Sequence, residues 1–181
     1  AGGGAWGGGG RGGCGEQVRA WVVGRALSVD GSVNGRAVGL RPMAPDDVEP
    51  FVSYWHDGGA ELAYLGIDPV KLGTAADTRQ RFDLLVHGPR PRQALGFTIT
   101  LDGRAVGFIN VNILGRERGR AHFHLVDPAA RRGGVMSTVL EGGLPQILER
   151  MRTESGADGL LVEIRTRNVG MNRVLQRLGH Q

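Results

Sequence analysis

Two histidines on one predicted strand are the residues of this chain that could do the most varied chemistry. The run AHFHLVD (121–127) is typical of a β-strand, so His122 and His124 point to one face and Phe123 to the other. They could bind zinc if a third ligand such as Glu163 or Asp127 joined them, but no His/Glu spacing marks one. They could equally be half-buried and hydrogen-bonded for structure. As a third alternative, a histidine that titrates near neutrality could transfer a proton.

The turn after this strand could bind an anion. It reads DPAARRGGVMS (127–137) and leads from the strand into an apolar helical pattern. The first amides of a helix have no helical acceptor and lie at the positive end of the helix dipole, and glycine lets an anion approach them because it has no Cβ. Taken alone, RRGG is more often a plain loop than a phosphate site. The strand-to-helix context favours the phosphate site.

Other polar side chains are candidates for the same chemistry. Glu163 lies on the next predicted strand and could orient a histidine or accept a proton through water. Glu117 falls in a predicted turn and Glu141 on a predicted exposed helix face, so we expect both to be solvated. Asn110 and Asn112 alternate with apolar residues, which puts both amides on one face of a strand. That face could line a pocket or face solvent.

Several elements must position these residues. Alternating or apolar runs predict a strand at 35–43, a hairpin at 94–114 that turns at Asp102-Gly103, and strands at 121–127 and 159–166. Apolar residues at helical spacing predict helices at 44–57, 74–88 with Thr74 as N-cap, 134–151 and 168–180. Pro145 predicts a kink near Glu141 or two shorter helices. We therefore expect an α/β (α+β) fold in which helices flank a mixed, largely antiparallel sheet.

The first 35 residues differ from the rest. They begin AGGGAWGGGGRGGCG, which cannot bury enough apolar surface to offset its chain entropy. We predict a flexible Gly-rich tail at 1–35 and one folded domain at 36–181. Cys14 is the only cysteine, so an intrachain disulfide and a multi-cysteine zinc site are excluded.

Composition restricts the partners. The net charge of +4 is shared between the tail and the domain, which is not the pattern of a nucleic-acid-binding protein. No apolar run reaches membrane-spanning length, and the N-terminus does not resemble a secretory signal. We expect a cytoplasmic protein that binds neither nucleic acid nor membrane.

The order of strand, helices, meander, R-x-x-G turn, helix, strand and N-x-x-x-x-x-V-L-x-x-L-G-H resembles the GNAT superfamily of N-acetyltransferases. Within it, LRPMAPDD (40–47) and NVGMNRVLQRLGH (168–180) look most like the branch of ribosomal-protein N-terminal acetyltransferases. The resemblance covers residues 36–181. It implies an enzyme that moves an acetyl group from acetyl-CoA, as co-substrate, to a primary amine on a peptide N-terminus or a small molecule, without a metal.

The resemblance also implies where the coenzyme binds. Leu125 and Val126, at the strand end, would pair with its pantetheine arm. The other implied coenzyme-binding residues are Arg131, Arg132, Gly133, Gly134, Val135, Met136 and Ser137 at the turn, for the pyrophosphate, and Asn168. Met136 stands where the family has glycine or alanine, so its side chain must turn away from the coenzyme.

Family members often place the catalytic base on strand 121–127, facing the acceptor. We rank His124 first, His122 second and Glu163 as a carboxylate rival, and we expect direct attack in a ternary complex. The family's tyrosine acid is replaced by Leu175, and the family continues beyond Gln181 with two strands, so we expect a sheet without the last strands and a possible homodimer. A non-catalytic domain that binds acyl-CoA or a partner protein is the alternative.

Overall fold

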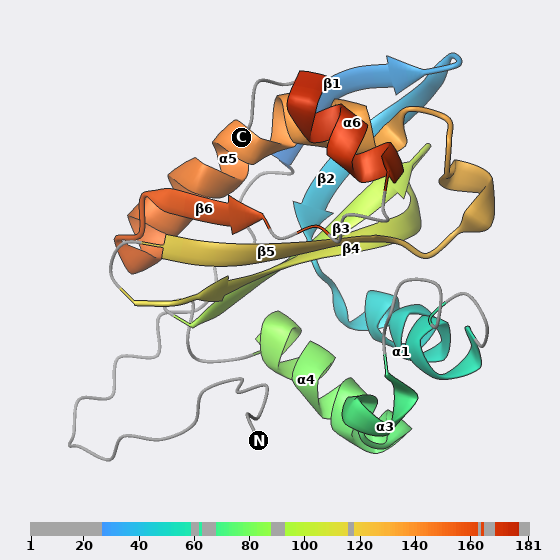
Figure 1. Ribbon diagram of the computed structural model, residues 1–181, viewed down its shortest axis with the longest axis vertical. Coiled ribbons are helices and arrows are strands. Elements are labelled where there is room, and N and C mark those ends of the chain that lie inside the picture. The colour runs from blue at the N-terminus through green and yellow to red at the C-terminus, as the bar shows by residue number, and fades with distance from the viewer. Residues whose placement is uncertain are drawn as a thin grey trace.

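One six-stranded sheet organises the chain (Figure 1). The computed structural model describes residues 27–58, 62, 68–87, 93–115, 118–162, 164 and 169–177. The strands lie in sequence order across the sheet: β1 (Leu27–Val33), β2 (Arg36–Pro42), β3 (Ala94–Leu101), β4 (Arg104–Ile113), β5 (Arg118–Leu125) and β6 (Gly159–Val162). Neighbours are antiparallel except β5 and β6, which are parallel. The predicted mixed, largely antiparallel sheet is confirmed.

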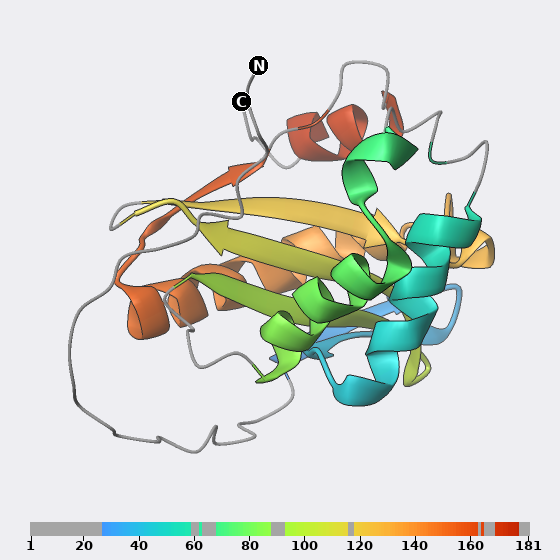
Figure 2. The same cartoon turned by 90° about the horizontal axis from the view of Figure 1, so that it is seen from below.

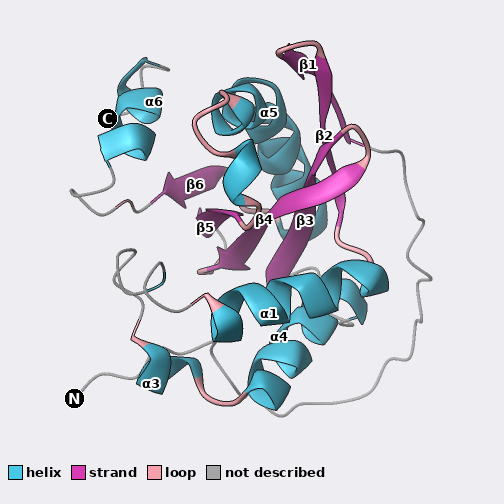
Figure 3. Ribbon diagram, turned by 90° about the vertical axis from the view of Figure 1, so that its right-hand side faces the viewer, coloured by secondary structure: helices cyan, strands magenta, loops and turns pink. Residues whose placement is uncertain are grey.

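Helices cover both faces of this sheet. The described helices of the chain are η1 (Pro45–Asp47), α1 (Val48–Asp57), α3 (Pro69–Leu72), α4 (Ala75–His87), η2 (Pro128–Ala130), α5 (Val135–Ser155) and α6 (Val169–Arg177). Figure 3 shows α5 on one face and α1 with α4 on the other, and Figure 2 shows α3 beside them. Within the described ranges, no helix is long and apolar enough to cross a membrane.

Two hairpins close with residues in the left-handed region. Asp102 and Gly103 have φ of 52° and 78°, which confirms the predicted turn between β3 and β4. Asn34 and Gly35, with φ of 53° and 76°, make the same kind of turn between β1 and β2. Strand β1 therefore lies inside the stretch predicted as tail, and the boundary at residue 35 is wrong. The Asn-Gly pair was the available signal, because it is a strong hairpin indicator. Residues 1–26 lie outside the described part of the chain.

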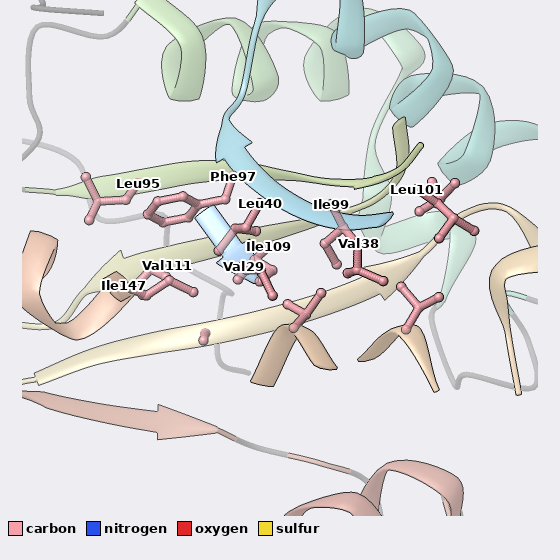
Figure 4. Close-up of a cluster of buried hydrophobic side chains, with 14 of the residues drawn as sticks. Val29, Val38, Leu40, Leu95, Phe97, Ile99, Leu101, Ile109, Val111 and Ile147 are labelled. Atoms are coloured by element: carbon pink, nitrogen blue, oxygen red, sulfur yellow. The ribbon is translucent and has the colours of Figure 1, made fainter. Parts of the chain in front are cut away.

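Alternation along the central strands divides the core into two layers. Ile109 and Val111 point to the α5 face and pack in one buried cluster with Ile147 (Figure 4). Phe108 points the other way and packs on Phe51, with ring centroids 4.8 Å apart. Each such side chain contributes about 1.5–3 kcal/mol through burial. Phe108 lies on the same face of the sheet as the candidate site. Helices α1 and α4 cover this face, so they form walls of that site.

Helix α5 runs through Pro145 without a break. Its neighbours Leu144 and Ile147 are buried and fix the helix against the sheet, whereas Pro145 and Glu141 lie on the exposed face. Water can therefore solvate the Glu141 carbonyl, which Pro145 leaves without a helical donor. The alternative of two shorter helices is wrong.

A buried carboxylate ties α1 to the sheet. Asp47 is 3% exposed and accepts hydrogen bonds from Arg41 at 2.6 and 2.7 Å, from the Ala44 amide at 2.8 Å and from the Thr98 hydroxyl at 2.7 Å. Burial raises the pKa of Asp47, but these hydrogen bonds outweigh burial and hold the pKa below its usual value. The network fixes where α1 begins, and therefore where its residues face β5.

We expect Asp47→Asn to lower the free energy of unfolding by about 2 kcal/mol, because the NH2 group of asparagine cannot accept a hydrogen bond from the donor that it would face. A lowered pKa gives stability that is present above the unfolded value and lost as the pH falls through the folded value. The difference in the free energy of unfolding between the parent protein and the variant should thus be largest above about pH 5 and decrease below about pH 4. Urea titrations across this range measure it. Exposed Asp46→Asn is the control, and equal losses in both variants would contradict the assignment.

Candidate active site

The two histidines lie on one face of β5, as predicted. The β4–β5 register places His124 opposite Phe108 and His122 opposite Asn110, on the face toward α1 and α4. Phe123 packs against the core cluster on the other face. The β-strand period thus brings the imidazoles and an amide together.

These residues line a cavity between the sheet and the helices. Its volume is about 220 Å³, which corresponds to roughly seven waters. The described residues that line it are Trp55, Leu72, Thr78, Arg81, Phe82, Leu85, Phe108, Asn110, His122 and His124. They come from α1, α3, α4, β4 and β5. The prediction that Asn110 could line a pocket agrees with this position, whereas Asn112 is not among the lining residues.

Aromatic rings surround His124. Its ring stacks on Phe108 at 4.9 Å and 22°, meets the edge of Trp55 at 4.7 Å and lies 5.9 Å from Tyr54, between ring centroids. Burial, with a smaller contribution from the charge of His122, lowers the pKa of His124 to about 3. The imidazole is therefore neutral at neutral pH. This pKa departs from the expectation that His124 titrates near neutrality, and the sequence alone does not show which rings pack on it.

The glycine turn offers backbone amides to an anion. Gly134 is the N-cap of α5 with φ of 88°, and no side chain caps this helix end. The first helical hydrogen bond runs from the Thr138 amide to the Gly134 carbonyl, so the amides of Val135, Met136 and Ser137 have no helical acceptor. A Cβ built on Gly133 or Gly134 would meet no heavy atom closer than 3.8 Å. A side chain at either glycine would therefore make only ordinary van der Waals contact with Val33 or Ala130.

Arg131 supports the end of β5. Its Nε and Nη2 donate to the Leu125 carbonyl at 3.0 and 2.7 Å, and the Val126 amide donates to the Val106 carbonyl at 2.9 Å. The Leu125 carbonyl and the Val126 amide are therefore already used within the protein, and the Val126 carbonyl also accepts from Arg131 Nη2 at 3.5 Å. A pantetheine arm would have to share the Leu125 carbonyl with Arg131. The predicted phosphate contact of Arg131 stays a prediction.

The first turn of α5 has a neighbour that sequence analysis missed. Met136 packs against the core cluster, so its side chain is turned toward the core, as its departure from glycine or alanine requires. The Ser137 hydroxyl accepts a hydrogen bond from Arg177 of α6 at 2.7 Å. Exposed Arg132 and Arg177 thus place two cations near the free amides. Leu175 is half-buried on the same helix as Arg177.

The described sheet partners of β5 change along its length. Strand β6 pairs with β5 from Arg118 to Ala121. From His122 to Leu125, the described strand beside β5 is β4 alone. This stretch of β5 leads to the turn before α5 and its free amides.

Tyr54 is a second residue near the candidate site that the sequence did not indicate, because it is distant along the chain from the last helix. Helix α1 brings its ring beside His124. Burial raises the pKa of Tyr54, and the nearby positive charge of Arg131 opposes this shift. The phenol is therefore protonated at neutral pH and lies near the end of β5. Only the packing of α1 on the sheet creates this proximity.

The structure does not bring the remaining described candidate residues to the histidines. Glu117, Glu163 and Asn168 lie outside the described residues, so their predicted roles stay predictions. Glu141 is exposed on α5, as expected. Asp127 forms an ion pair with Arg104 and caps η2 through the Ala129 amide, so it is not directed at the histidines. In the described ranges, no group of three His, Cys, Asp or Glu residues could hold a metal ion.

Comparison with known proteins agrees with this geometry. The family model described as "Acetyltransferase (GNAT) domain" matches residues 37–181. No curated protein sequence matches the chain.

Solved structures with the same fold include several acetyltransferases. RimL, a ribosomal alpha-N-protein acetyltransferase in complex with coenzyme A, has 18% identity and a TM-score of 0.61, over 81% of this chain and 80% of that one. Mycobacterium smegmatis RimJ, in complex with CoA-disulfide, has 20% identity and a TM-score of 0.57, over 81% and 71%. MccE, a microcin self-immunity acetyltransferase in complex with acetyl-CoA and AMP, has 12% identity and a TM-score of 0.59, over 78% and 77%.

Proposed function

Because the chain belongs to the GNAT family and is an acetyl-CoA-dependent acyltransferase, we propose that it acetylates a primary amine held in the cavity beside β5. The observation that carries this proposal is the course of β5. One strand bears His122 and His124 toward the cavity, extends from His122 to Leu125 beyond its described pairing with β6, and leads to the free amides of α5. Acceptor, thioester and pyrophosphate would then lie in order along it. We expect this to occur in the cytoplasm.

The coenzyme would bind through the backbone more than through side chains. The pyrophosphate would accept hydrogen bonds from the amides that follow Gly134, where the helix dipole also favours an anion. Arg132 and Arg177 would add positive charge at the same place. The pantetheine arm would run beside the stretch of β5 from His122 to Leu125.

Transfer would proceed by direct attack. The ammonium first gives one proton to the base, the amine nitrogen then bonds to the thioester carbonyl carbon, and the carbon–sulfur bond breaks to release the thiolate. The nitrogen loses a second proton as the amide forms, and this loss balances the proton that the thiolate takes up. We place the base at His122, because the pKa of His124 near 3 makes that imidazole a weak proton acceptor. Neutral His124 would then act as part of the cavity wall. Glu163 remains the rival base.

Tyr54 would donate a proton to the departing thiolate. In the family a tyrosine on the last helix has this role, and in this chain Leu175 stands at its position. We expect Tyr54→Phe to lower kcat about tenfold and leave the Kd of acetyl-CoA unchanged, since only the hydroxyl is lost. Steady-state kinetics with calorimetry measure both. Tyr54→Phe keeps the ring that packs beside His124, so it is its own packing control. Unchanged kcat would assign the protonation to water.

A non-catalytic acyl-CoA-binding domain is the second candidate, favoured by the replacement of the family acid by Leu175 and by the weak basicity of His124. Calorimetry with acetyl-CoA and with CoA, followed by mass spectrometry of a panel of peptides, amino acids, aminoglycosides and polyamines, separates the two. Acetylation of any panel amine supports the enzyme. Binding of acetyl-CoA without acetylation favours the second candidate, and binding of neither ligand at tens of micromolar contradicts both.

A further inference from the structure

We propose that the acceptor is an amine that also carries a carboxylate, such as an amino acid or a short peptide with a free C-terminus, and that Arg81 and Asn110 select it. This inference rests on the proposed function, because it assumes that the cavity holds the acceptor. It is argued from the charges, the polar groups and the walls of that cavity.

The charge of the cavity excludes polycations. Among the described residues that line it, none carries a carboxylate and Arg81 carries the one fixed charge. A polyamine or aminoglycoside would bring several ammonium groups to a cationic wall without a counter-ion, at a cost that a low local dielectric increases. A ligand carboxylate would instead be attracted there.

Arg81 has donors to spare. Its Nη1 donates to the Leu72 carbonyl at 3.2 Å, which holds the guanidinium at the junction of α3 and α4. A guanidinium has five N–H donors in a planar fork that matches a carboxylate. Asp77 lies close enough to interact with Arg81, but its carboxylate accepts from the Thr74 amide and hydroxyl, both at 2.8 Å, and it does not line the cavity. The fork is therefore positioned in advance for an incoming carboxylate.

Asn110 supplies a second polar contact. It is 6% exposed, lines the cavity, and no described residue hydrogen-bonds to its side-chain amide. Its side-chain amide faces the cavity and is not among the buried polar atoms that lack a partner, so water can solvate it in the free protein. A ligand that displaces this water must replace its hydrogen bonds to the amide. An amide can donate to a carboxylate or carbonyl and accept from an amine, which are the groups of an amino acid or peptide.

The walls suit an apolar body. Trp55, Phe82 and Phe108 present rings, and Leu72 and Leu85 add aliphatic surface. An apolar side chain between the amine and the carboxylate would replace water from these walls. The cavity thus combines an apolar wall with one cation and one amide.

The test compares reaction products with and without the carboxylate. N-acetyl-L-phenylalanine and N-acetyl-L-alanyl-L-phenylalanine would each be titrated against its C-terminal amide, by NMR, with CoA present and absent. We expect the acid of at least one pair to bind about tenfold more tightly than its amide. Arg81→Gln should abolish that preference and Arg81→Lys should retain part of it. Arg79→Gln, on the same helix but paired with Glu49 outside the cavity, should leave it intact.

Asn110→Leu gives an independent readout. It removes the amide's hydrogen-bonding groups at similar size, so we expect little change in stability together with about tenfold weaker binding of the preferred acid. Equal binding of acid and amide in both pairs, or a preference that survives Arg81→Gln, would overturn the proposal. Product binding can be measured without turnover, so the carboxylate preference is tested separately from the proposed function. The proposed function fails if acetyl-CoA does not bind.

Discussion

Gly134→Val should weaken acetyl-CoA binding about 100-fold and leave the fold intact. A Cβ at this position has room within the protein, since the nearest heavy atoms belong to Val33 at 3.8 Å. Under the proposed function, the added valine side chain would crowd a pyrophosphate bound to the amides that follow Gly134. Losing two hydrogen bonds to a charged phosphate, at about 1.5 kcal/mol each, corresponds to roughly this factor. The backbone adds a cost of about 1–2 kcal/mol in stability, because φ is 88° and valine is unfavourable there. Calorimetry with acetyl-CoA and urea denaturation measure the two effects.

Gly156→Val is the matched control for this experiment. Gly156 caps the opposite end of α5, has φ of 76°, and has no heavy atom within 4 Å of a built Cβ. Both variants should therefore lose similar stability, and only the Gly134 variant should lose coenzyme affinity. Equal affinity in the two variants would show that the turn before α5 does not bind the pyrophosphate.

His122→Gln should lower kcat at least about 100-fold while the Kd of acetyl-CoA stays the same. Glutamine keeps a hydrogen-bonding side chain in the cavity but cannot accept the proton of the ammonium. Rapid-quench or steady-state kinetics at saturating coenzyme, with calorimetry for Kd, separate chemistry from binding. His87→Gln, on the exposed end of α4, should behave as the parent protein. Unchanged kcat would move the base to His124 or Glu163.

The pH dependence distinguishes the two histidines further. With a pKa of about 3, His124 stays neutral above that pH and gains a proton only below it. It cannot produce an inflection of kcat/KM between pH 5 and 8. Any inflection found there should therefore persist in His124→Gln, measured over this range with the same amine. Its loss in that variant would show that the surroundings of His124 change in the working enzyme.

The sequence by itself determined most of the elements and the direction of the site residues. A period of two on AHFHLV puts both histidines on one face whatever the rest of the fold does, and Asp102-Gly103 imposes a hairpin through its backbone preferences. The apolar spacing of α1, α4 and α5 predicted which faces are buried. Strand β1 was missed because the Gly-rich start of the chain outweighed the local Asn34-Gly35 signal.

Only the tertiary structure decided the chemistry of those residues. His124 and His122 are equivalent in sequence pattern, but the rings of Phe108, Trp55 and Tyr54 converge on His124 from two elements, β4 and α1, and lower its pKa. Burial and ring contacts depend on how α1 and α4 pack on the sheet, which no local pattern encodes. The same packing brings Tyr54 to the end of β5, and the position of α6 brings Arg177 to the first turn of α5. A residue's type and strand position follow from short-range sequence, whereas its pKa and its partners depend on contacts between distant segments.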